Sequence, residues 1–242
     1  LTNYAGYYSR NAGSFFSTSS GTPAVFTGYK FSGCTKLSTL YFWGSSGLTG
    51  PFPKFNHSNL YHIDLTHTKM SGGGPDGNLA SDTDYAIPRD TFLNAPGLEA
   101  FYVQSGKLIK KPIHPEAFSF SPLLRNIRVR SYGEIDGSLP SFSALSNLYW
   151  LDFEGNAFTG SVPSFSSNPK IAYVYLHDNQ FSGTIPSFKN LSRLDYLYLH
   201  QNRKSSTTGF TALSAPENLP NLTRFYVHNN RIQGEIPDFS EC

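Results

Sequence analysis

The sequence predicts a strand-dominated α/β solenoid, in which short repeats stack along one axis. The first observation is a fixed period, because Leu148, Ile171 and Leu194 open three similar segments and lie 23 residues apart. The second is the spacing within each segment, where apolar residues at offsets 0, 3 and 5 are typical of a short half-buried strand. A fixed period in the range of roughly 20–50 residues indicates a solenoid.

Composition restricts the class of protein. Of the 242 residues, 15% are charged and 15% aromatic, so the chain can bury a core and is not disordered. The net charge of +2 is small and scattered, which argues against a nucleic-acid partner. No apolar run approaches the ~18 residues of a membrane span. The first residue is Leu1 rather than Met, which fits removal of a secretory signal.

Residues 1–33 lack the repeat and are rich in Tyr and Phe among Gly, Ser and Thr. An array of repeats needs a cap over the open end of its core. We therefore expect an N-terminal cap of short strands and turns at 1–33, followed by a solenoid at 34–242 without a C-terminal cap.

Eight repeats follow one another along the chain. They open at Leu37, Leu60, Leu98, Leu124, Leu148, Ile171, Leu194 and Leu222. Two insertions, 73–85 and 204–218, are expected to leave the stack as turn-rich loops on its outer or edge side. The first contains Asp76, Asp82 and Asp84, which allows a calcium site, although a solvated loop is the favoured interpretation.

Two further positions recur in the repeats. The Asn after each strand can bond turn backbone groups, so a column of Asn should tie neighbouring repeats together. These residues are Asn156, Asn179, Asn202 and Asn230. A recurrent Phe should form a stack inside the outer wall. Its members are Phe55, Phe142, Phe165, Phe188 and Phe239.

These segments resemble the leucine-rich-repeat family. NAFTGSVPSF, NQFSGTIPSF and NRIQGEIPDF are similar to the plant-type repeat NxFxGxIPxF. FSGCTKLSTLYF, DTFLNAPGLEAFYV and EAFSFSPLLRNIRV resemble the bacterial and protist surface type, AFxxCxxLxxI. The resemblance implies a right-handed horseshoe of about eight repeats, with a parallel sheet on the concave side and turns, 3-10 helix and short strands on the convex side. The paired-cysteine N-terminal cap of plant receptors is absent, which argues against a plant receptor ectodomain.

The resemblance also implies that ligands bind the concave face, which we define as the outward strand residues of the parallel sheet. Flat amphipathic side chains there offer contact area at low entropy cost, which suits a protein or glycan ligand. Packing of duplicated residues against one another is an alternative compatible with binding. The predicted binding residues are Tyr41, Trp43, Tyr102, Tyr173, Tyr175, His177, Tyr196, Tyr198, His200, Tyr226 and His228.

A metal site is not predicted. His177, His200 and His228 should lie in a line with steps of about 4.8 Å, so their nitrogens do not converge on one ion. The row could respond to pH, because stacked imidazoles repel once protonated. The other histidines show no ligand spacing and are expected in turns or facing solvent. They are His57, His62, His67 and His114. No cofactor is predicted.

Four charged residues fall on the outward positions of the fourth and fifth repeats. Asp152 and Glu154 could form a catalytic carboxylate pair, since residues i and i+2 of a strand are roughly 7 Å apart. The favoured interpretation is structural, with Arg128 facing Asp152 and Arg130 facing Glu154 as cross-strand ion pairs. The face is expected to be open to water. No nucleophile, base and orienting residue are recognisable as a set, so the sequence predicts no catalytic residues and no enzyme.

Cys34 and Cys242 occupy the same repeat phase and are expected to be buried as small apolar residues. About eight steps of about 4.8 Å separate them, which excludes a mutual disulfide. Three sequons, at Asn56, Asn190 and Asn221, are weak glycosylation signals.

The sequence thus predicts a non-catalytic extracellular or cell-surface recognition module that binds a protein or glycan on its concave face. The alternative is a structural subunit. In that case the last repeat would contact a second copy head to tail and build a filament, sheath or virion appendage.

Overall fold

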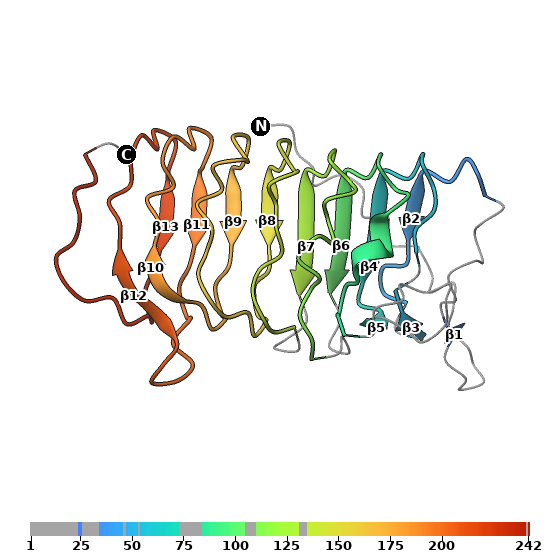
Figure 1. The fold of residues 1–242 in the computed structure, drawn as a ribbon, viewed down its shortest axis with the longest axis horizontal. Coiled ribbons are helices and arrows are strands. Elements are labelled where there is room, and N and C mark those ends of the chain that lie inside the picture. Colours follow the sequence, from blue (N-terminus) through green and yellow to red (C-terminus); the bar gives the residue numbers. More distant parts are fainter. Residues whose placement is uncertain are drawn as a thin grey trace.

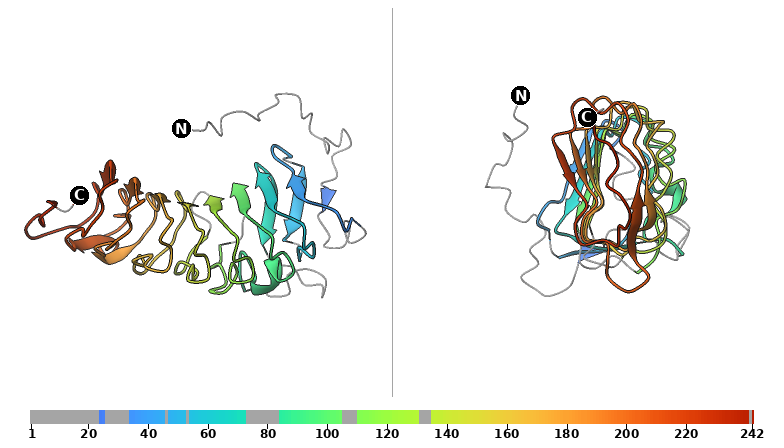
Figure 2. Two further views of the ribbon diagram at one scale, coloured as in Figure 1. Left: turned by 90° about the horizontal axis from the view of Figure 1, so that it is seen from above. Right: turned by 90° about the vertical axis from the view of Figure 1, so that its left-hand side faces the viewer.

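The structure, a computed structural model, describes residues 24–25, 34–45, 47–52, 54–72, 84–104, 110–130, 135–240 and 242. The chain forms an elongated solenoid in which strands lie side by side along the long axis (Figure 1). Seen from above, the large sheet lies on the inner side of a shallow curve and the remaining elements on the outer side (Figure 2). The predicted N-terminal cap falls almost entirely outside the described residues, as does most of the insertion 73–85.

An eight-stranded parallel sheet is the main element, in the order β13-β11-β9-β8-β7-β6-β4-β2. Each strand comes from one repeat, which confirms the predicted strand-dominated solenoid. The strands are β2 (Thr39–Tyr41), β4 (His62–Thr66), β6 (Ala100–Gln104), β7 (Asn126–Arg130), β8 (Trp150–Asp152), β9 (Tyr173–Tyr175), β11 (Tyr196–Tyr198) and β13 (Arg224–Tyr226).

Short elements form the convex side. Parallel strands β1 (Ala24–Val25), β3 (Leu48–Pro51) and β5 (Lys69–Gly72) make one small sheet. Parallel strands β10 (Ser182–Ile185) and β12 (Gly209–Leu213) make another. Within the described residues the helical element is a single 3-10 turn, η1 (Arg89–Phe92). The sequence had suggested a loop at 204–218. This expectation is wrong in part, because β12 lies inside that insertion.

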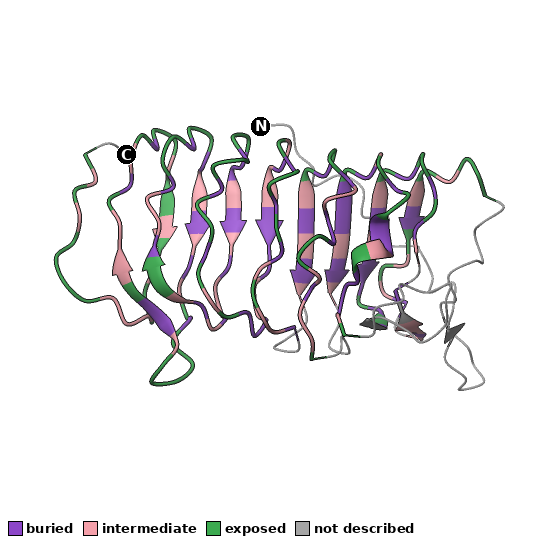
Figure 3. Ribbon diagram, in the orientation of Figure 1, coloured by how far each residue is buried: buried purple, intermediate pink, exposed green. Residues whose placement is uncertain are grey.

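The core lies between the two sides, as the burial colours show (Figure 3). Phenylalanine rings follow one another along it with centroid distances of 5.9, 5.7, 6.3, 6.1 and 6.2 Å. The stack runs through Phe55, Phe92, Phe118, Phe142, Phe165 and Phe188. Phe239 was wrongly assigned to it: this half-buried ring contacts Phe225 at 5.9 Å instead.

The asparagine column joins successive repeats. The Asn179 amide donates to the carbonyl of Phe153 in the preceding repeat at 2.9 Å, and its oxygen accepts from the Phe158 N–H at 3.1 Å. Asn156, Asn202 and Asn230 also donate to a carbonyl of the preceding repeat. The residue before each Asn has positive φ, for example 58° at Asp178, and this left-handed conformation ends the strand. The predicted asparagine column is confirmed.

Both cysteines are exposed, so the expectation that they are buried is wrong. Leu145 and Leu191, at the same phase in central repeats, are buried because neighbouring repeats cover them on both sides. Cys34 precedes the first strand of the large sheet and Cys242 follows the last. Each cysteine therefore has a described neighbouring repeat on one side only.

Candidate functional site

The concave face carries three columns of side chains, because parallel pairing sets equivalent residues of adjacent strands side by side. The register aligns Tyr173 with Tyr196, and Tyr175 with Tyr198. Trp150 aligns with Tyr173 and Arg224 with Tyr196, which places both in the first column. Trp150 and Arg224 were not among the predicted binding residues, although they share the repeat phase of Tyr173 and Tyr196.

Tyrosine rings cover β9, β11 and β13. Tyr173 and Tyr196 meet edge to face at 5.1 Å, and Tyr198 stacks on Tyr226 at 4.6 Å with an interplanar angle of 13°. A hydrogen bond from the Tyr173 hydroxyl to Tyr149, together with burial, raises the pKa of Tyr173 to about 12. Burial and the neighbouring Tyr198 also raise the pKa of Tyr175. These two hydroxyls therefore remain neutral hydrogen-bonding groups at physiological pH.

The histidine row lies beside the tyrosines, just beyond the strand ends. His177 and His200 stack at 4.4 Å, and His200 and His228 stack at 4.5 Å. Burial, followed by the neighbouring His177 and His228, lowers the pKa of His200 to about 4. His200 is accordingly neutral at pH 7, which permits the close stacking.

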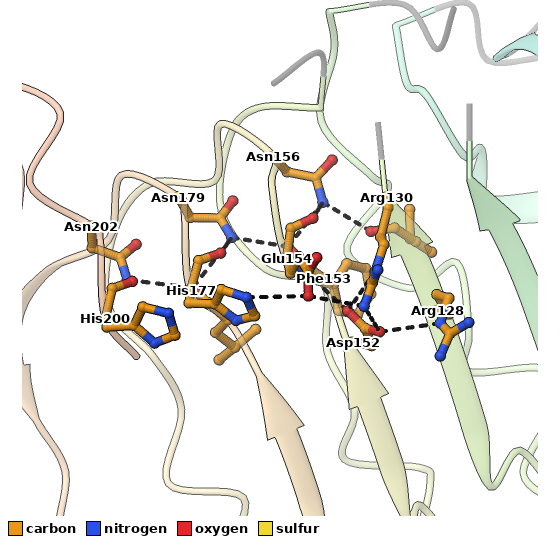
Figure 4. Close-up of polar contacts among 12 residues, drawn as sticks. Arg128, Arg130, Asp152, Phe153, Glu154, Asn156, His177, Asn179, His200 and Asn202 are labelled. Carbon is orange, nitrogen blue, oxygen red and sulfur yellow. Dashed lines mark hydrogen bonds and ion pairs between the residues drawn. The ribbon is translucent and has the colours of Figure 1, made fainter. Parts of the chain in front are cut away.

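Four charged residues form a cluster at the start of the histidine row, which we call the acid–arginine cluster: Arg128, Arg130, Asp152 and Glu154. The Asp152 side chain is 0% exposed and accepts from the Arg128 Nε at 3.1 Å and the Arg130 Nη2 at 2.6 Å. Arg130 also contacts Glu154 at 2.9 Å, and the His177 Nε2 lies 3.2 Å from the Glu154 Oε2 (Figure 4). The hydrogen bond from His177 is the main reason why the pKa of Glu154 is lowered.

The cluster differs from the expectation of an open face, because Asp152 is sealed from water. The Arg128 guanidinium lies 5.8 Å from the Trp150 ring, and Arg128 and Arg130 together cover the carboxylate. Arg130 bridges both carboxylates, whereas the sequence suggested one Arg for each acid. With its oxygens held by arginines, Asp152 is not placed to act as a catalytic carboxylate.

Three of the predicted binding residues lie apart from the others, at the N-terminal end of the sheet. Tyr41 is 59% exposed and its ring lies 4.7 Å from His62. Trp43 is 49% exposed, and Tyr102 contacts the other side of His62 at 5.2 Å. The acid–arginine cluster separates this group from the tyrosines of β9, β11 and β13.

Two histidines do not match their sequence-based assignment. His62 is half-buried inside β4, because it occupies the first outward position of that strand, and burial lowers its pKa. His57 is buried, whereas a turn or solvent-facing position was expected. The three sequon asparagines, Asn56, Asn190 and Asn221, are exposed.

Comparison with known proteins identifies the fold. The sequence profile of the family described as Leucine Rich Repeat matches residues 221–242. Comparison with curated protein sequences found no match. A solved TDR receptor superposes with a TM-score of 0.66 over 84% of this chain and 32% of its own, at 24% sequence identity. The chain has a leucine-rich-repeat fold.

Further leucine-rich-repeat structures are similar. The Arabidopsis receptor kinase HAESA, solved with the peptide hormone IDA and the co-receptor SERK1, gives a TM-score of 0.56 at 23% identity, covering 85% of this chain and 36% of its own. The PEPR1–AtPEP1 structure gives 0.59 at 24% identity, covering 83% and 28%. The chain thus spans about a third of each of these proteins.

The described residues contain neither a recognisable metal site nor a membrane-spanning helix. Among the described residues, no group of three or more His, Cys, Asp or Glu side chains could hold a metal ion. In that part of the chain, no helix has the length and apolar character needed to cross a bilayer.

Proposed function

We propose that the chain is a non-catalytic recognition module, extracellular or on the cell surface, that binds a polypeptide segment on its concave face. One observation carries the proposal: β9, β11 and β13 present tyrosine rings in two adjoining columns and histidine rings in a third. Tyr226 in this surface is 43% exposed. Tyrosine supplies contact area with few rotatable bonds, so little entropy is lost when a ligand binds.

The solved structures of similar fold support a polypeptide ligand over a glycan at this face. HAESA was solved with the peptide hormone IDA, and PEPR1 with AtPEP1. In this chain, Arg224 lies 4.5 Å above the Tyr196 ring and donates to the Tyr198 hydroxyl at 3.4 Å. An exposed cation beside tyrosine hydroxyls can engage a carboxylate or a backbone carbonyl of a peptide.

Peptide display tests the proposal. A random peptide library is selected on the purified protein, and the enriched peptides are measured by calorimetry on wild type and on the triple variant Tyr175→Ala, Tyr198→Ala, Tyr226→Ala. We expect affinity to fall at least tenfold in the triple variant, because interface tyrosines are typical hot spots.

The matched control removes three exposed side chains away from the concave face: Lys189→Ala, Thr211→Ala and Gln233→Ala. This control should bind like wild type. Equal affinity of the tyrosine variant and wild type, or loss only in the control variant, would contradict binding on the concave face.

Self-association is a second candidate, favoured by the end of the sheet at β13. This strand pairs with β11 alone among the described strands, and Ile236 beyond it is 87% exposed. Sedimentation velocity over a hundredfold concentration range tests it. Assembly through this end is supported if the sedimentation coefficient rises with concentration and Ile236→Asp abolishes the rise. A sedimentation coefficient that stays at the monomer value over the whole range would exclude it.

Glycosylation of Asn56, Asn190 and Asn221 also stays a proposal. The Asn221 amide nitrogen donates to the Ser192 carbonyl at 2.6 Å, so attachment of a glycan there requires this bond to break.

A further inference from the structure

A second surface of the molecule is hollowed where the strands of the large sheet begin. A pocket of about 440 Å³ lies on the lateral edge, in the size range of small-ligand sites. Glu99, Arg125 and Tyr149 line it, each directly before β6, β7 or β8. The pocket therefore lies at the opposite strand ends from the histidine row and contains none of the predicted binding residues.

Positive charge dominates the pocket. Lys170 and Arg193 line it, and neither forms an ion pair within the described part of the chain. The Lys170 ammonium instead donates to the neutral Asn147 side chain at 2.7 Å. Arg125 has one acidic neighbour, Glu99, at 3.8 Å, and both side chains are about half exposed. Three cations thus face one carboxylate, an excess that attracts an anion.

Two of the residues that line the pocket, Leu123 and Tyr149, offer apolar surface. Leu123 is 46% exposed, although leucines elsewhere in the repeats are mostly buried. The Tyr149 ring meets Tyr173 edge to face at 5.3 Å, and the two hydroxyls are hydrogen-bonded, so the tyrosine is held in place. A rigid aromatic ring beside a leucine can receive the C–H face of a sugar ring.

We propose that this edge pocket binds an anionic saccharide, a sugar that carries a carboxylate or a sulfate. Lys170 and Arg193 would contact the anionic group, and Tyr149 with Leu123 would support the ring. Asn147 and Glu99 would bond to hydroxyls. Glu99 favours a saccharide over an acidic peptide of equal charge, because its carboxylate can accept hydrogen bonds from sugar hydroxyls, whereas ionised acidic side chains have no proton to donate.

Calorimetry with defined oligosaccharides tests the proposal. The probes are tetragalacturonate for carboxylates, a heparin tetrasaccharide for sulfates, a neutral dextran oligosaccharide and oligoglutamate. We expect at least one acidic saccharide to bind, dextran and oligoglutamate to bind at least tenfold more weakly, and affinity to fall with added salt. Comparing galacturonate with heparin then tells which anionic group is preferred.

Charge-removing variants locate the site. Lys170→Gln with Arg193→Gln should lower the affinity at least tenfold, since charge-assisted contacts are lost. The control, Lys36→Gln with Arg203→Gln, removes the same charge from exposed residues outside the pocket and should leave the affinity within twofold. Tyr149→Leu should lower the affinity for the saccharide without altering the dependence of that affinity on salt.

The inference fails if no acidic saccharide binds, if oligoglutamate binds as well as the sugars, or if the pocket and control variants behave alike. It does not depend on the concave-face proposal. The charge-removing variant Lys170→Gln with Arg193→Gln should still bind the display-selected peptides, and the triple tyrosine variant should still bind the saccharide, so either proposal can fail while the other stands.

Discussion

Asp152 is the residue on which the acid–arginine cluster depends, because it is sealed from water between two guanidinium groups. Removing one partner of a buried ion pair leaves uncompensated charge and costs about 3–5 kcal/mol. We predict that Asp152→Ala lowers the free energy of unfolding by about that amount, measured by urea denaturation.

Glu154→Gln is the matched control, since the Glu154 side chain is 31% exposed and surface pairs contribute about 0–1 kcal/mol. An Asp152→Ala variant no less stable than Glu154→Gln would show that the buried pair does not stabilise the fold.

His200 gives the concave face a defined pH response. Its pKa is lowered to about 4 from 6.5, so the folded state resists protonation more than the unfolded state does. The stability that neutral His200 contributes is fully present above pH 6.5. It declines as the pH falls below 6.5, where the unfolded chain takes up a proton, and is lost below pH 4.

We therefore predict that NMR titration places the His200 midpoint near pH 4 and that His177→Gln with His228→Gln moves it upward. The removal of two neighbouring imidazoles takes away part of the cause of the shift. A midpoint near 6.5 in the wild-type protein would contradict the stacked arrangement.

Individual residues were predictable from the sequence where the repeat phase determines them. The Tyr175–Tyr198 and His177–His200 neighbours follow from equal positions in successive repeats. The bridging role of Arg130 did not follow, because a long side chain can reach either of two acids on the next strand. The burial of His57 lay outside the phase pattern altogether.

At the scale of single elements, four strands, β8, β9, β11 and β13, are each followed by a left-handed residue and an asparagine that bonds to the previous repeat. Asn179→Ala would leave the Phe158 N–H unbonded in the core, and the Phe153 carbonyl would keep only its bond from Asn156. A buried unsatisfied group costs about 1–3 kcal/mol. We predict that the variant loses about 1–3 kcal/mol of unfolding free energy, measured by circular dichroism in urea.

Asn147→Ala is the comparison, because among the described residues that side chain bonds only to Lys170, outside the core. Its loss should stay within about 0.5 kcal/mol, as for ordinary surface substitutions. Equal losses in the two variants would indicate that the asparagine column does not hold the repeats together.

The strands of the large sheet were predictable because every repeat opens with the same apolar spacing at offsets 0, 3 and 5. The convex elements were harder to place. Strand β12 lies within an insertion that has no repeat phase, and it forms because β10 offers an edge for parallel pairing. The periodicity of the sequence therefore does not predict such a strand.

At the scale of the whole molecule, stacking produces two surfaces of different chemistry at opposite ends of the same strands. The concave face carries aromatic rings, the exposed Arg224 and a charge cluster around the buried Asp152, whereas the edge pocket carries three cations with one carboxylate. The sequence indicated the first through its repeated tyrosines and histidines. The second surface was missed although the sequence carries a signal for it, because Lys170 and Arg193 each directly precede a residue that opens a repeat. Arg125 follows such a residue, so the three cations do not share a single phase.

We propose that ligands bind the concave face over β9, β11 and β13. Hydrogen–deuterium exchange of the protein with and without a display-selected peptide tests this proposal. Backbone amides at 173–177, 196–200 and 224–228 should exchange more slowly when the peptide is bound. Protection confined to β10, β12 or the edge pocket, with these three segments unchanged, would contradict it.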